Sequence, residues 1–169
     1  MGYSWSMIVD ASDHCRVIAF TEGQGARIGA VPEGLVKMPE DKLEIVDSAD
    51  LPPLWEAFGA HRRSDGRWTL PELADDVASP DGALHIGPQH VVLETAAMDL
   101  AAALVGTDRL QLRAWHVMFL ARGKVGPFRV DGEAFRGAGS TVGVRLTLHD
   151  EGNADRRVTA ASALLDVVP

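Results

Sequence analysis

Residues 88–105, PQHVVLETAAMDLAAALV, decide the fold of this 169-residue chain. Alanine, valine and leucine fill 11 of these 18 positions and Met98 a twelfth, so the apolar residues do not keep to one side of a helix. A helix that is apolar all round is typical of a segment buried on every side. We expect this helix to begin near Pro88, because proline suits the first turn, and to end at Gly106.

Glu94 is a carboxylate near the middle of this largely apolar helix. Burial disfavours the charged form of a carboxyl group, which raises its pKa and makes its carboxylate a better proton acceptor. A buried glutamate therefore usually has a partner or a chemical role. Glu94 is either a catalytic carboxylate or the partner of His90, one turn earlier on the same face, or of a basic residue from a neighbouring strand.

Strand-like segments follow the helix, separated by glycine-bearing breaks that suit hairpin connections. A short helix over residues 54–58 and an extended segment over residues 68–73 precede it. The four strands expected after the helix cover residues 110–120, 128–136, 142–149 and 157–168. One buried helix followed by an antiparallel meander indicates an α+β fold rather than alternating βαβ units.

Residues 79–94 and residues 116–126, HVMFLARGKVG, resemble the hotdog-fold acyl-CoA thioesterases of the phenylacetate-pathway type. Residues 132–148 and 158–166 are similar to the last strands of that family. The resemblance implies a hotdog domain over residues 51–169, with an antiparallel sheet wrapped around one long central helix. It also implies a homodimer or homotetramer whose sheets join edge to edge, with acyl-CoA thioesters bound between subunits.

The resemblance places the catalytic carboxylate on Glu94, as nucleophile or as general base for water. Backbone N–H groups at the amino end of the helix, at Ile86 and Gly87, are the expected oxyanion donors, because the helix dipole is positive there. Ile86 stands where the family has a glycine, and Ser79 stands where many members have an asparagine that places water or substrate. His85 at the mouth of the helix is an expected substrate contact.

Arg122 and Lys124 lie in the break after the first of the four strands. Coenzyme A carries several negative charges, so these two cations are candidates for its phosphates, although solvated loop charges are an equal alternative. The chain as a whole has 24 acidic against 16 basic side chains, a formal charge of −8. This balance argues against a nucleic-acid or membrane-surface protein.

No metal ion or resident cofactor is expected, since coenzyme A enters as part of the substrate. His85 and His90 lack the spacing of four residues that pairs two ligands on one helical face, and no third ligand accompanies them. Trp55 and Trp115 either line an acyl pocket or serve ordinary packing.

Residues 1–50 differ in texture from the rest and are expected to form a separate extension. A strand-like run at residues 15–20 is followed by turn-forming glycines and prolines, including Gly23 and Gly25. This extension is a lid, a set of extra strands or a worn second copy of the fold. A cytoplasmic location is expected, because the first residues have neither a basic start nor an apolar signal segment.

Together these patterns predict an acyl-CoA thioesterase. A non-catalytic hotdog protein that binds acyl-CoA or another small ligand is the alternative, and it suits the departures at Ile86 and Ser79. A hotdog hydratase or dehydratase is less consistent with the sequence, because no Asp and His pair has the required spacing.

Overall fold

The structure is a computed structural model, and it describes residues 2–25 and 48–169. The chain divides into two compact units, Met1–Pro39 and Glu40–Pro169, which are described separately below. The boundary expected from the sequence, between residues 50 and 51, stays a prediction.

The first unit contains an antiparallel hairpin of β1 (Gly2–Val9) and β2 (Val17–Gly25). Trp5 and Met7 alternate with serines in β1, and Met7 lies opposite Phe20 of β2, so these three large apolar side chains share one face. All three are largely exposed within the chain. A two-stranded hairpin has no apolar layer of its own to bury these residues.

The strand expected at residues 15–20 is confirmed in substance as β2, which continues to Gly25. Gly23 and Gly25, expected to form turns, instead lie within that strand, where extended backbone accepts any residue. The turn-forming residues expected between 26 and 47 lie outside the described residues.

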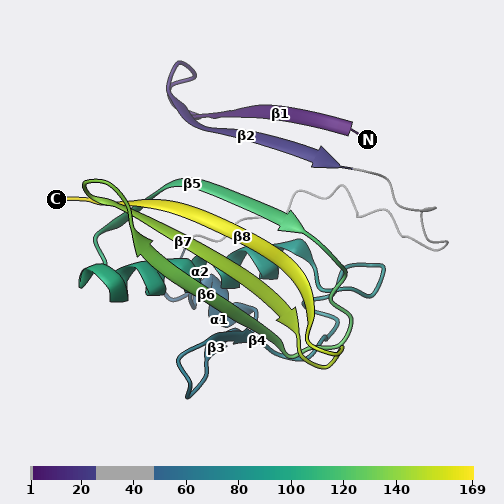
Figure 1. Cartoon of the computed structure of the whole chain (residues 1–169). Coiled ribbons are helices and arrows are strands. Elements are labelled where there is room, and N and C mark those ends of the chain that lie inside the picture. Colours follow the sequence, from purple (N-terminus) through teal and green to yellow (C-terminus); the bar gives the residue numbers. More distant parts are fainter. Residues whose placement is uncertain (1, 26–47) are drawn as a thin grey trace. The chain divides into compact units, whose positions relative to one another are not determined.

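The second unit is an antiparallel sheet of six strands in the order β3-β4-β6-β7-β8-β5. The strands are β3 (His61–Arg62), β4 (Trp68–Leu70), β5 (Leu110–Phe119), β6 (Phe128–Arg136), β7 (Thr141–Asp150) and β8 (Arg156–Val167). Its helices are α1 (Leu54–Ala57) and α2 (Ile86–Val105). The strands curve over α2, which lies along one face of the sheet (Figure 1). This arrangement confirms the α+β architecture and the long central helix.

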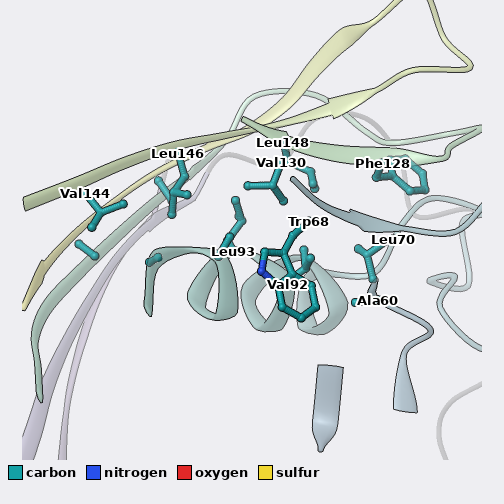
Figure 2. Close-up of a cluster of buried hydrophobic side chains, with 14 of the residues drawn as sticks. Ala60, Trp68, Leu70, Val92, Leu93, Phe128, Val130, Val144, Leu146 and Leu148 are labelled. Carbon is teal, nitrogen blue, oxygen red and sulfur yellow. The ribbon is translucent and has the colours of Figure 1, made fainter. Parts of the chain in front are cut away.

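The core lies between α2 and the inward face of the sheet. Val92 and Leu93 of α2 are fully buried against alternate residues of β6 and β7 (Figure 2). The sheet side chains that point toward the helix are Phe128, Val130, Val142, Val144, Leu146 and Leu148. Every second side chain of these strands is therefore buried against one face of the helix.

The expectation that α2 is buried on every side is wrong for the single chain. Its buried residues are Pro88, Gln89, Val92, Leu93, Ala96, Ala97 and Ala101, which share one face. The sheet covers only one side of α2, and α1 is too short to cover the rest. The other side, which includes Glu94, stays half-buried or exposed.

Capping residues define both ends of α2. The helix begins at Ile86, two residues earlier than expected, and Pro88 falls in its first turn, where no N–H is needed. His85 is the N-cap, and Gly106 ends the helix in the left-handed conformation with φ 79°. No helix in the described part of the chain is long and apolar enough to cross a membrane.

Candidate active site

The turn before α2 is organised by Ser79. The Ser79 N–H donates to the Ala83 carbonyl at 2.7 Å, and the Ser79 hydroxyl lies within hydrogen-bond distance of both the Asp81 carboxylate and the Ala83 carbonyl. The hydrogen bond from Ser79, assisted by the charge of Arg122, lowers the pKa of Asp81. The Ser79 hydroxyl, expected to place water or substrate, is thus engaged within its own turn.

The amino end of α2 presents one free backbone donor. The His85 N–H donates to the Val77 carbonyl at 2.9 Å, and the Gly87 N–H donates to Nδ1 of the His85 side chain at 3.2 Å. Pro88 has no N–H. Among the described residues nothing accepts a hydrogen bond from the Ile86 N–H, and the Ile86 side chain is 54% exposed. Of the two expected oxyanion donors, Ile86 is available and Gly87 is occupied.

A buried pair that the sequence analysis missed anchors this end of the helix. The Gln89 side chain is only 4% exposed and donates from Nε2 to the Leu84 carbonyl at 2.9 Å. The Thr159 hydroxyl from β8 donates to Oε1 of Gln89. Both polar groups are satisfied, so they hold the segment before α2 against the sheet. A polar residue on an apolar helix was the available signal for Gln89, as it was for Glu94.

Asp150 at the end of β7 holds the neighbouring loop and was also missed. Its fully buried carboxylate accepts three backbone N–H groups, from Lys124 at 2.7 Å, Val125 at 3.2 Å and Gly126 at 2.7 Å. In the same loop, the Gly123 carbonyl accepts a hydrogen bond from the Leu84 N–H at 2.9 Å. Asp150 therefore supports the segment that leads into α2 through two hydrogen-bonded steps.

Arg122 and Lys124 both turn toward residues 79–82. Arg122 forms an ion pair with Asp81, and Lys124 Nζ donates to the Asp81 and Gly82 carbonyls at 3.0 and 2.9 Å. Arg122 remains exposed on its outer side. Both cations are therefore already engaged by Asp81 and the turn carbonyls.

Glu94 is exposed in the single chain and accepts no hydrogen bond from any described residue. His90, one turn earlier, is half-buried against β5, and its Nδ1 accepts the indole N–H of Trp115 at 3.1 Å. Burial lowers the pKa of His90, and the charge of Glu94 partly opposes this shift. Among the described residues, no element covers the side of α2 that carries Glu94, so this carboxylate is exposed rather than buried as the sequence predicted.

The two tryptophans of uncertain role differ in their surroundings. Trp55 packs edge-on against Trp68 of β4, with ring centroids 5.1 Å apart, which supports the packing interpretation. Trp115 faces the strip of α2 that carries His90, so it adjoins the candidate site. Among residues 2–25 and 48–169, no three His, Cys, Asp or Glu side chains cluster as a metal site would require.

Several solved structures are similar in fold to this chain. A mutant of a thioesterase from Staphylococcus aureus superposes with a TM-score of 0.58 at 20% identity, covering 69% of this chain and 98% of that one. The chain has the hotdog fold. A Bacillus halodurans protein crystallised with CoA shares this fold, with a TM-score of 0.57 at 15% identity over 68% of this chain and 75% of that one.

A third hotdog neighbour is a phenylacetic acid degradation-related protein from Ralstonia eutropha, with a TM-score of 0.57 at 19% identity. It is covered over 92% of its length by 70% of this chain. No protein-family model matches the sequence, and no curated protein matches it either. At these identities the similarity establishes the fold, which confirms that part of the sequence-based expectation.

Proposed function

We propose that this protein is an acyl-CoA thioesterase in which Glu94 attacks the thioester carbonyl carbon or activates water for that attack. The observation that carries the proposal is the pairing, on one strip of α2, of an exposed carboxylate at Glu94 with the free N–H of Ile86. The S. aureus neighbour is a thioesterase and the B. halodurans neighbour was crystallised with CoA, which supports the substrate class.

The spacing of Ile86 and Glu94 calls for two copies of the chain. Eight residues of α-helix separate them, a rise of about 12 Å. A reacting carbonyl needs its oxyanion donor and its attacking oxygen each about 3 Å away. One copy therefore supplies the Ile86 N–H and a second copy supplies Glu94.

The edge strand β5 is the natural surface for this assembly. It is ten residues long, pairs with β8 alone among the described strands, and exposes Met118 and Phe119. A long unpaired edge is a template for pairing with another strand. Because His90 packs against β5, the strip of α2 that carries Glu94 faces the same region. Pairing through β5 would cover Glu94 and provide the burial that the single chain lacks.

The reaction needs no metal or resident cofactor in this proposal. As the carbonyl carbon becomes tetrahedral, the Ile86 N–H stabilises the oxyanion with help from the positive end of the α2 dipole. If Glu94 is the base, the proton that it takes from the attacking water passes to the sulfur as the C–S bond breaks, which leaves the carboxylic acid and the thiol. If Glu94 is the nucleophile, breaking the C–S bond leaves a mixed anhydride on Glu94, and water then hydrolyses it to the acid while the coenzyme A thiolate takes up the proton released. Arg122 and Lys124 would meet phosphates of the coenzyme.

One observation favours the alternative of a binding protein without turnover. The Gly87 N–H is occupied by His85 and the Ser79 hydroxyl by its own turn, so the site offers one oxyanion donor rather than two. The test is thiol release from short, long and aromatic acyl-CoAs, measured beside calorimetric binding of the same compounds. Thiol release supports hydrolysis, whereas binding of intact thioester without release supports the alternative. A change in enoyl absorbance without thiol would indicate a hydratase.

Two substitutions with matched controls separate the two catalytic groups. Glu94→Gln removes the carboxylate, and Glu72→Gln is its control, because Glu72 is also exposed. Ile86→Pro removes only the N–H at the first helical position, where proline is favoured, and the ψ of 152° at His85 suits a residue before proline. Ile86→Ala keeps the N–H and is its control. We expect Glu94→Gln and Ile86→Pro to abolish turnover and the two control substitutions to preserve it.

A further inference from the structure

The hydrogen bond between Trp115 and His90 determines which ring nitrogen of His90 carries the proton. An indole N–H can only donate, so Nδ1 of His90, 3.1 Å from Trp115 Nε1, must be unprotonated to accept it. The neutral ring then carries its proton on Nε2. His90 thus has one remaining polar group, an Nε2–H donor.

Its surroundings keep His90 in this neutral form. The ring is half-buried on α2, with Phe119 of β5 edge-on at a centroid distance of 5.6 Å. Protonating Nδ1 would set two donors, the ring N–H and the Trp115 N–H, against each other. Glu94 is the one charged group among the described residues that acts on His90 from α2 or β5. His90 is therefore placed to donate rather than to act as a base.

We propose that His90 is a positioning residue whose Nε2–H donates to the Glu94 carboxylate and so aims the other carboxylate oxygen at the thioester. The two side chains are not hydrogen-bonded in the single chain, but they are four residues apart on one face of α2, a spacing at which a change of side-chain rotamer lets them meet. His90 has an unused donor and Glu94 has an unused acceptor. This inference rests on the proposed role of Glu94, and it adds Trp115 as the residue that sets the tautomer.

Nitrogen NMR of the ¹⁵N-labelled full chain at neutral pH tests the inference without any turnover. We expect Nδ1 of His90 to show the shift of an unprotonated nitrogen and Nε2 that of a protonated one. Trp115→Phe should move Nδ1 and mix the tautomers, whereas Glu94→Gln should move Nε2. His116→Gln is the control, because His116 is exposed on the same strand and pairs with Ser162 of β8.

Kinetics then separate positioning from a purely structural role. His90→Leu should lower kcat about tenfold, the loss expected from one hydrogen bond to a charged group, with little change in KM. His90→Gln, whose amide both accepts and donates, should recover most of that loss. A proton on Nδ1 in the unmodified chain, an Nε2 signal unmoved by Glu94→Gln, or equal kcat for His90→Leu and His90→Gln would each overturn the inference. If no thioester is hydrolysed, the proposed function fails while the NMR result still decides the tautomer and its partner.

Discussion

Replacing Asp150 by alanine should cost this protein a large share of its stability. The Asp150 carboxylate is fully buried and is the acceptor for the N–H groups of Lys124, Val125 and Gly126. Alanine would leave these three donors without that acceptor. Hydrogen bonds to a charged group contribute about 1.5–3 kcal/mol each, and the low end for three gives a loss of about 4.5 kcal/mol. Small proteins have only about 5–15 kcal/mol in total.

Urea unfolding followed by circular dichroism measures this loss. With an m-value of about 2 kcal/mol/M for a chain of this size, the midpoint should fall by about 2 M. The midpoint of Asp150→Asn should fall by about half as much, because the asparagine side chain keeps one oxygen that can accept the backbone N–H groups. Asp108→Ala is the control, since Asp108 is exposed, and should stay within about 0.5 kcal/mol.

A midpoint change below about 0.5 M in Asp150→Ala would refute the reasoning. It would mean that water or a shifted loop satisfies the three N–H groups at little cost. If the loss is found, a second result is expected, because the Gly123 carbonyl of the same loop accepts the Leu84 N–H. Residues 83–85 should exchange their amide hydrogens faster in Asp150→Ala than in the unmodified chain.

Three further results are expected. Gly152→Ala should destabilise the protein by about 2 kcal/mol or more, because its new Cβ would meet the Gly126 carbonyl oxygen. The three atoms nearest to a Cβ at Gly143 all belong to the exposed Phe135 ring, so Gly143→Ala should cost less than about 1 kcal/mol, and equal urea midpoints for the two variants would contradict this. Hydrogen bonds from Arg129 lower the pKa of Asp131. The stability that this carboxylate contributes is therefore present above its unfolded pKa and is lost as pH falls through the lowered folded value, so the melting temperature should drop below about pH 4. The drop should be less steep in Asp131→Asn, and parallel curves for the two proteins would count against a contribution of the ion pair. Gln89→Leu should destabilise by about 1–3 kcal/mol in urea, since it leaves the buried Thr159 hydroxyl without its acceptor, and an unchanged midpoint would show that this hydroxyl finds another.

The helix and the four strands after it could be predicted because their signals are local. The apolar run that became α2, the glycine at its end and the glycine-bearing breaks between the later strands each depend on neighbouring residues. The same local evidence overstated the burial of α2. Composition shows that a helix tolerates burial, but the number of layers that cover it depends on the sheet and on other copies of the chain.

The supports of the site could not be predicted, because they join distant residues. Asp150 binds N–H groups 24 to 26 positions earlier, and Trp115 bonds to His90 from 25 positions away. Only the register of β5 and β7 in the folded sheet brings these partners together. Ser79 shows the converse: its place in the resemblance suggested a role in catalysis, yet a carboxylate two residues away engages its hydroxyl.

The proposed function depends on a site shared by two copies of the chain, and mixing two inactive variants tests this. Differently tagged Glu94→Gln and Ile86→Pro chains, co-expressed and purified through both tags, form mixed dimers. If one copy supplies Glu94 and the other the Ile86 N–H, each mixed dimer has one intact site and should release thiol from acyl-CoA at about half the unmodified rate. Mixed dimers as inactive as either parent, beside active unmodified dimers carrying the same two tags, would contradict the shared site.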